Sequence, residues 1–144
     1  MDTTQPDAAI DPARFGETQR CFGCGPGNSR GLGLRFYRQG DAVCTEWVPG
    51  EGYEGPPGVL HGGLQAFLAD EVGAWAVSEL TGRVGFTTAM SVRYLRPARI
   101  GEPIRATARI RYLLPTRHQA ERVLGGALPQ AWLPLIPDTD EVPP

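Results

Sequence analysis

A histidine, two glycines and two adjacent acids stand close together in one apolar stretch of the sequence. His61, Gly62 and Gly63 are followed within one helical stretch by Asp70 and Glu71. Backbone N–H groups at a glycine-rich helix start can stabilise an oxyanion, and a carboxylate can take a proton from water or attack a carbonyl carbon. The pattern therefore predicts a catalytic site for a carbonyl substrate.

The spacing from Gly62 to Asp70 separates these two groups within one helix. A rise of about 1.5 Å per residue puts Asp70 about 12 Å along the axis from Gly62. A base and an oxyanion donor must each lie within about 3 Å of the reacting atoms, so one site needs Asp70 from one subunit and Gly62 from another. We therefore expect a two-fold dimer with two equivalent sites across its interface.

Each of these residues also has a purely structural alternative. Glu71 lies about 100° round the helix from Asp70, so we expect only one acid to point into a given site and favour Asp70. His61 can cap a turn through backbone hydrogen bonds, and the glycine pair can serve tight packing. The two acids can instead bind backbone donors in a dimer interface.

Two of the three cysteines form a Cys-x-x-Cys pair in the stretch CFGCGPGN. A zinc site needs further ligands, and neither Cys44 nor the two histidines, His61 and His118, supply a matching second pair. The glycines and proline around Cys21 and Cys24 predict a turn rather than the helix start that a redox pair prefers. We therefore expect buried or turn thiols and no metal.

The composition excludes several function classes. The formal net charge of the 144 residues is -2, which gives no reason to expect a nucleic-acid partner. All 14 cationic side chains are arginine, so a Schiff-base lysine and a Walker-type phosphate loop are excluded. The apolar runs are too short to cross a bilayer and the acidic beginning lacks a signal pattern, so we expect a cytoplasmic protein without a membrane partner.

A long helix is predicted to position the two acids. Good helix formers run from about Gly63 to Leu80, and Gly82 suits the left-handed position after a helix. This helix is apolar nearly all round, which predicts burial on several sides by a sheet.

Alternating residues on both sides of this helix predict an antiparallel sheet. A hairpin is expected around the turn RQGD, and two further strands are expected over 86–94 and 104–112. Prolines beyond Leu114 argue against central strands there. The order strand, strand, helix, strand, strand predicts an α+β domain.

Four stretches carry a resemblance to a known family: CFGCGPGNSRGLGLRF, GPPGVLHGGLQAFLADEVGAWA, TTAMSVRYLRPARIGE and IRATARI. The chain resembles hotdog-fold thioesterases, specifically the phenylacetate-pathway-like (PaaI-like) acyl-CoA thioesterases. The resemblance implies the hotdog fold, an antiparallel β-sheet wrapped around one long central helix. It also implies a homodimer or homotetramer that hydrolyses acyl-CoA thioesters without a cofactor, coenzyme A being part of the substrate.

The resemblance also implies roles for individual residues. Asp70 corresponds to the general base or nucleophile, Gly62 to the oxyanion donor, and Thr87 to a residue that assists the base or the water. His61 joins them as a candidate catalytic residue. We place Gly63 and Glu71 beside the substrate, together with Arg93 and Arg96, which either grip the CoA phosphates or are solvated charges at a strand end.

Two departures from the family pattern leave alternatives open. Gly55 stands where several relatives have an asparagine that orients the nucleophile or thioester. This favours, as the alternative function, an acyl-CoA-binding hotdog domain without turnover; a hotdog hydratase is a second rival.

The second departure is at the C-terminal end, which is either a divergent terminus or the product of a shifted reading frame. The expected organisation is a loose tail over 1–19, a hotdog domain over 20–126 and a proline-rich tail over 127–144.

Overall fold

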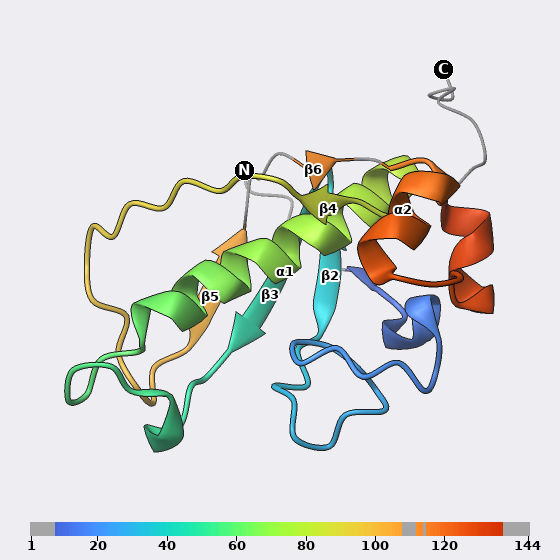
Figure 1. The fold of residues 1–144 in the computed structure, drawn as a ribbon. Helices are drawn as coiled ribbons and strands as arrows, with labels where there is room; N and C mark the ends of the chain where they lie inside the picture. Colours follow the sequence, from blue (N-terminus) through green and yellow to red (C-terminus); the bar gives the residue numbers. More distant parts are fainter. Residues whose placement is uncertain (1–7, 108–111, 114, 137–144) are drawn as a thin grey trace.

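The computed structural model of the chain describes residues 8–107, 112–113 and 115–136, in which one long helix lies across an antiparallel sheet (Figure 1). The strands are β1 (Ala8–Ala9), β2 (Phe36–Gln39), β3 (Ala42–Trp47), β4 (Phe86–Thr87), β5 (Ile104–Thr107) and β6 (Tyr112–Leu113). The helices are α1 (Gly62–Thr81) and α2 (Arg117–Leu124), with 3-10 turns η1 (Pro12–Phe15), η2 (Glu51–Tyr53) and η3 (Gln130–Leu135).

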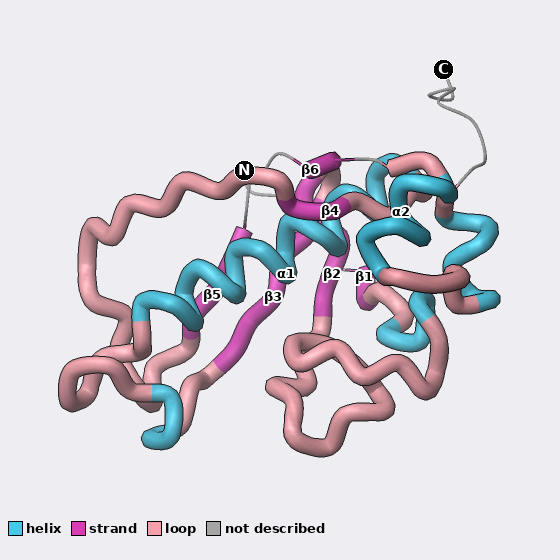
Figure 2. Tube along the Cα trace, in the orientation of Figure 1, coloured by secondary structure: helices cyan, strands magenta, loops and turns pink. Residues whose placement is uncertain are grey.

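The strands form two antiparallel sheets (Figure 2). The larger has the order β1-β2-β3-β5, and β4 pairs with β6 in a separate ladder. In the hairpin, Phe36 pairs with Thr45 and Gln39 with Ala42. Gly40 occupies the turn with φ 58°, a left-handed conformation that glycine adopts without strain. The predicted hairpin and the α+β arrangement of an antiparallel sheet with one long helix are confirmed.

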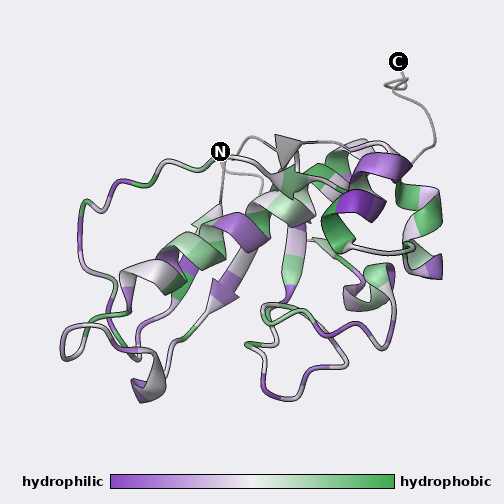
Figure 3. Cartoon of the chain, viewed as in Figure 1, coloured by the Kyte–Doolittle hydropathy of each residue, from purple (hydrophilic) through white to green (hydrophobic). Residues whose placement is uncertain are grey.

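Helix α1 begins and ends close to the predicted residues. His61 caps its start, and Gly82 ends it in the left-handed conformation, with its N–H bonded to the carbonyl oxygen of Ser78 at 2.9 Å. Figure 3 shows hydrophobic residues along the helix, interrupted near its middle by a hydrophilic band. No helix among the described residues is both long and apolar enough to cross a membrane.

The main core lies between α1 and the larger sheet. Leu68, Val72 and Trp75 of α1 are almost completely buried, and the Trp75 ring stacks on Phe36 of β2 with ring centroids 5.1 Å apart. Burying large apolar side chains is the dominant stabilising contribution to such a fold. On its other side α1 meets only the short β4-β6 ladder among the described residues, and most of its remaining side chains are half-buried.

Residues 8–19 differ from the loose tail that the sequence predicts. β1 pairs with β2, and the Phe15 ring packs edge-on against Trp75 with centroids 4.9 Å apart. The sequence showed no periodicity here because the segment is held by contacts with distant residues rather than by its own regular structure. Residues 1–7 of the predicted tail lie outside the described residues.

The strand predicted over 86–94 is wrong for most of its length. Only Phe86 and Thr87 pair, with Leu113 and Tyr112, and the chain then continues without regular structure to Pro103, apart from an isolated bridge between Arg99 and Val59. An alternating sequence forms a strand only where a neighbouring strand takes its hydrogen bonds, and β6 offers just two described residues. The other predicted strand, 104–112, is present as β5, while 108–111 lie outside the described residues.

The end of the chain forms a second, smaller core that the sequence did not predict. α2 begins with a capping box, in which Gln119 N–H bonds to Thr116 Oγ1 at 3.3 Å and the Gln119 side chain accepts from Thr116 N–H at 2.9 Å. A buried cluster then joins this helix to η3 and to the segment after α1; its members are Val84, Ala120, Leu128 and Ile136. The proline-rich segment as far as residue 136 is therefore packed against the domain.

Candidate functional site

Asp70 and Thr87 meet on the side of α1 that faces the small β4-β6 ladder. Thr87 Oγ1 donates a hydrogen bond to Asp70 Oδ1. Asp70 is half-buried in the middle of α1, whereas Thr87 is exposed at the end of β4. A hydroxyl donor of this kind fixes the orientation of a carboxylate, which a general base needs. The structure thus brings together two of the residues that the resemblance pairs.

The start of α1 carries the histidine and the two glycines. His61 Nδ1 accepts a hydrogen bond from the Gly63 N–H at 3.0 Å, so the ring acts as the helix cap. A Cβ on Gly63 would lie only 3.1 Å from His61 Nδ1, which explains a glycine at this position. The Tyr94 hydroxyl donates to the Gly62 carbonyl oxygen at 2.8 Å. No described residue accepts a hydrogen bond from the Gly62 N–H, so this group remains a candidate oxyanion donor.

Gly62 and Asp70 do not meet within one chain. Both lie on α1, which begins at Gly62, and eight residues of helix separate them by about 12 Å. A single acyl carbonyl cannot reach both groups at hydrogen-bond distance. A site that joins Gly62 of one copy to Asp70 of another therefore stays a prediction.

Glu71 points to a different neighbourhood from its neighbour Asp70. Its carboxylate oxygen Oε1 lies 3.2 Å from Cys21 Sγ, and Cys24 lies in the same cluster. Cys21 and Glu71 are half-buried and Cys24 is buried. All three cysteines of the chain are free thiols. The expectation of turn thiols agrees with this arrangement, but the sequence gave no sign that an acid would join them.

The acidities in this cluster are strongly shifted. Burial, followed by the nearby Cys21 charge, raises the pKa of Glu71 from 4.5 to about 8. A hydrogen bond from Cys24 lowers the pKa of Cys21 from 9.0 to about 5. The same bond, together with burial, raises the pKa of Cys24. In the structure Cys21 Sγ donates to Glu71 Oε1, and the shifts make Glu71 a weaker acid than an ordinary carboxyl group and Cys21 a stronger acid than an ordinary thiol.

A cavity of about 190 Å³ adjoins this cluster. Aromatic residues from separate parts of the chain form its apolar walls: Phe15, Trp75, Phe86 and Trp132. Cys21, Cys24 and Glu71 supply polar atoms on one side. Glu71 lines this cavity and Asp70 does not, so the cavity is a separate site from the Asp70–Thr87 pair.

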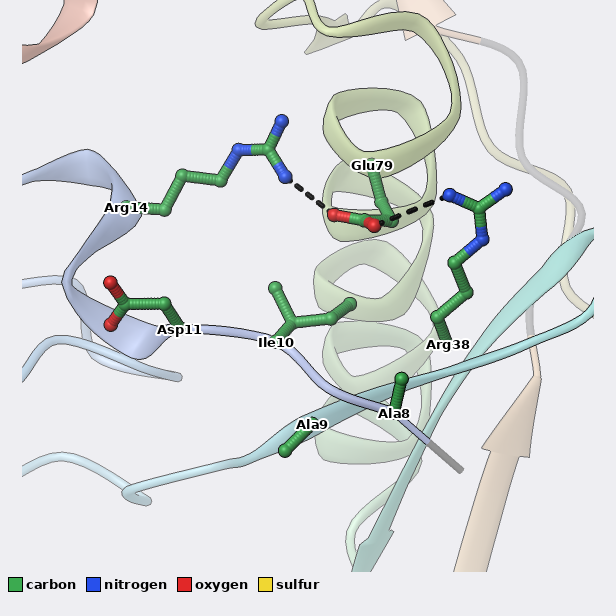
Figure 4. Close-up of a pocket in the computed structure, with 7 residues that line it drawn as sticks. All are labelled: Ala8, Ala9, Ile10, Asp11, Arg14, Arg38 and Glu79. Atoms are coloured by element: carbon green, nitrogen blue, oxygen red, sulfur yellow. Dashed lines mark hydrogen bonds and ion pairs between the residues drawn. The ribbon is translucent and has the colours of Figure 1, made fainter. Parts of the chain in front are cut away.

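A second cavity, of about 350 Å³, lies between the N-terminal segment and the end of α1 (Figure 4). Glu79 of α1 stands between Arg14 of η1 and Arg38 of β2 and forms ion pairs with both, that with Arg38 at 3.4 Å. The negative charges of the acids that line this cavity balance the positive charges of its arginines, and no predicted site residue lines it. Its charges hold the N-terminal segment in place.

Arg93 and Arg96 lie on the irregular segment that follows β4. Both are exposed, and no ion pair joins either of them to another described residue. The same segment exposes four large apolar side chains, namely Met90, Val92, Tyr94 and Leu95, the last of them 80% exposed. The two arginines are therefore free to contact an anionic ligand, but the structure does not bring them to Asp70.

Sequence reasoning missed the partners of Glu71 and of Gly62. Tyr94 was noted only for its place in an alternating pattern, and the cysteine pair was tested only against other cysteines and histidines. A search that had included carboxylates as third ligands would have added Glu71 to the list of candidates.

Comparison with known proteins identifies the family that this chain resembles. The thioesterase superfamily matches residues 57–119, which include the His-Gly-Gly start of α1, both acids and Thr87. A solved structure described as a thioesterase superfamily protein is 31% identical, with a TM-score of 0.57. The match covers 69% of this chain and 52% of that one, so our chain spans about half the length of this relative.

A second solved structure, a thioesterase superfamily protein from Shewanella loihica PV-4, is 28% identical with a TM-score of 0.49, over 55% of this chain and 69% of that one. No curated protein matches this sequence. The family match and the first structure confirm the resemblance to hotdog thioesterases. The PaaI-like subgroup stays a prediction.

Proposed function

We propose that this chain, a hotdog protein of the thioesterase superfamily, is a thioester hydrolase that acts on acyl-CoA. The observation that carries the proposal is the hydrogen bond from Thr87 of β4 to Asp70 of α1. The glycine start of α1, at Gly62, lies eight residues before Asp70. Asp70 takes a proton from water or attacks the thioester carbon directly. Thr87 holds the carboxylate in place, and the Gly62 N–H stabilises the oxyanion.

The reaction is balanced without a cofactor. Water adds to the thioester carbon while Asp70 accepts its proton, which gives a tetrahedral intermediate with its negative charge near the Gly62 N–H. Collapse of this intermediate breaks the C–S bond, and the proton returns to the leaving thiolate. The products are the free acid and coenzyme A.

A homodimer, or a homotetramer built from it, is part of the proposal. Gly62 and Asp70 of one chain cannot serve one substrate, so each site takes its oxyanion donor from the other copy. Support comes from the half-buried side of α1 that the larger sheet leaves uncovered and from the exposed apolar residues on the segment after β4. Arg93 and Arg96 on that segment are then suited to the CoA phosphates, with Gly63 near the acyl group. Glu71 faces Cys21 instead and is left out of this substrate site. A cytoplasmic location stays a prediction from the sequence.

Release of free coenzyme A from a panel of aryl and fatty acyl-CoAs tests the proposal. We expect the chain to hydrolyse at least one substrate and Asp70→Asn to lower its rate by about 100-fold or more. Asp41→Asn, in the exposed hairpin turn, is the matched control and should keep the wild-type rate. Equal rates for wild type and Asp70→Asn would remove Asp70 from the mechanism.

A second candidate function is acyl-CoA binding without turnover. Gly55 packs against His61, with a Cβ position only 3.3 Å from the His61 Cα, so no side chain there orients a nucleophile. Saturable binding of an acyl-CoA without release of thiol on any substrate would favour this second function.

A further inference from the structure

Two thiols and one carboxylate converge at the turn before β2. One ligand atom from each of Cys21, Cys24 and Glu71 lies within 4.8 Å of the other two, and this is the one such group among the described residues. Glu71 lies about 100° round α1 from Asp70, and the proposed thioester hydrolysis does not use the sulfur atoms of this cluster.

The donor set matches the chemistry of a zinc-type cation. Zn²⁺ takes thiolate sulfur at about 2.3 Å and carboxylate oxygen at about 2.0–2.2 Å, in tetrahedral geometry. Ligand atoms at those distances lie roughly 3.3–3.8 Å from one another, so the three atoms need to draw together by only about 1 Å. Soft thiolate ligands select zinc over magnesium or calcium.

The surroundings also favour a cation. The cavity beside the cluster has apolar walls, and none of the residues that line it carries a positive charge. Anionic groups in apolar surroundings are costly unless they are paired or coordinate a metal. A divalent cation would neutralise two of the three negative charges of the two thiolates and the carboxylate, and the cavity of about 190 Å³ has room for a water molecule as fourth ligand.

The backbone of the turn holds the two thiols toward the helix. Gly25 N–H bonds to the Cys21 carbonyl oxygen at 3.0 Å, and Gly27 N–H bonds to that of Gln19 at 3.0 Å. A Cβ on Gly23, between the cysteines, would lie 2.4 Å from the Glu71 carboxyl carbon. The absence of a side chain at this position is what lets the carboxylate reach the sulfur atoms.

We propose that Cys21, Cys24 and Glu71 bind one divalent cation of the zinc type, with water in the fourth position. The two thiolates and the carboxylate each donate one electron pair, the protons that these groups held pass to water, and no atom changes oxidation state. The ion joins the turn of residues 19–27 to α1 and so stabilises the helix that carries Asp70.

Cobalt binding to the reduced, metal-free full-length chain tests this site. Co²⁺ bound by thiolates gives a charge-transfer absorption in the near ultraviolet, and Zn²⁺ should remove it because zinc binds thiolate sites more tightly. We expect the absorption in wild type. For Cys21→Ser and for Glu71→Gln, the Co²⁺ concentration that gives half of the absorption should be at least about tenfold higher than for wild type.

Cys44→Ser is the matched control. Cys44 is buried in β3, in the larger sheet, and is outside the cluster, so this variant should keep the absorption at the wild-type Co²⁺ concentration. Wild type that gives no charge-transfer absorption overturns the proposal. Equal Co²⁺ binding by wild type and Cys21→Ser overturns it as well. A third contrary outcome is that Cys21 and Cys24 form a disulfide and bind no metal.

A measurement on the unmodified chain keeps the proposal testable if the variants do not fold. Zn²⁺ should slow alkylation of Cys21 by at least about tenfold, as measured by mass spectrometry of the digested protein, whereas Mg²⁺ should not. Equal alkylation of Cys21 with and without Zn²⁺ overturns the proposal.

Discussion

Asp70 and Glu71 are neighbours in the sequence, yet they lie in different chemical surroundings. Asp70 receives a hydroxyl hydrogen bond from Thr87, while Glu71 lies against the thiol of Cys21, and burial raises its pKa to about 8. Successive residues of a helix point about 100° apart, so two adjacent acids need not share a site. The middle of α1 thus serves two regions: an oxygen-rich one suited to water chemistry and a sulfur-rich one suited to a cation.

The largest expected effect is on the hydrolysis rate, and it tests whether Asp70 of one copy of the chain works with Gly62 of another. Gly62→Pro removes the proposed oxyanion N–H at the first position of α1, where proline is tolerated, and should lower the hydrolysis rate by about 100-fold. Asp70→Asn should have a similar effect. A mixed sample of the two inactive variants, after subunit exchange, should regain about a quarter of the wild-type rate because hybrid dimers contain one intact site.

That experiment separates a shared site from one built within a single chain. A mixture that stays as inactive as its components would contradict the two-copy site. Elution of the wild-type chain at monomer mass, together with full activity, would contradict it as well.

The next effect tests the Glu71 region through the dependence of stability on pH. The folded chain holds a proton on Glu71 up to about pH 8, whereas the unfolded chain loses it near pH 4.5, so this group destabilises the fold as pH rises between those values. Cys21 acts in the opposite direction, because its pKa falls from 9.0 to about 5 on folding. Glu71→Gln removes the first effect, and it also weakens the second because a hydrogen bond with Glu71 contributes to the lowered pKa of Cys21.

We therefore expect Glu71→Gln to gain stability relative to wild type as pH rises from about 5 to 8, by on the order of 3 kcal/mol. Urea unfolding of metal-free, reduced protein at several pH values measures this difference. Glu51→Gln, on the exposed η2 turn, is the matched control. A difference between Glu71→Gln and wild type that is constant over this pH range would contradict the prediction.

A smaller effect is expected for the threonine that holds Asp70. Thr87→Val keeps the shape of the side chain but removes the hydrogen bond, which should lower kcat about tenfold and leave KM nearly unchanged. Thr87→Ser restores the hydroxyl and should restore most of the rate. If the serine variant is as slow as the valine variant, the hydroxyl is not what positions Asp70.

The smallest effect on stability is expected for Gly23→Ala. The new Cβ would meet only the end of the flexible Glu71 side chain, so the free energy of unfolding should change by less than about 1 kcal/mol. Gly25→Ala is the contrasting variant. Its Cβ would lie 2.5 Å from the Cys21 backbone nitrogen, which cannot move aside, so it should cost more. Thermal unfolding compares the two, and equal losses would contradict the geometry of the turn.

Local patterns in the sequence predicted the elements that local interactions determine. Helix α1 and the hairpin were predicted because their periodicity, the glycine after the helix and the turn residues act over a few positions. The resemblance predicted the Asp70–Thr87 pair. α2 also had a local signal, the capping box from Thr116 to Gln119, which was overlooked.

Features that depend on distant residues were not predicted. The strand expected after Thr87 needed a neighbour that extends beyond β6, and alternation alone cannot supply one. The order in residues 8–19 depends on contacts of Phe15 with Trp75 and Trp132. The approach of Glu71 to Cys21 joins segments that are far apart in the sequence, so no local spacing indicates it.

The contact between Gly23 and Glu71 has a consequence for comparing related sequences. Any side chain at position 23 would occupy the space that the carboxyl group takes in this fold. Glycine at 23 and an acid at 71 should therefore covary among relatives. Both residues should be present where a carboxylate contacts the cysteine pair, and both positions should vary where no carboxylate does. Such covariation would be the evolutionary trace of a three-residue contact.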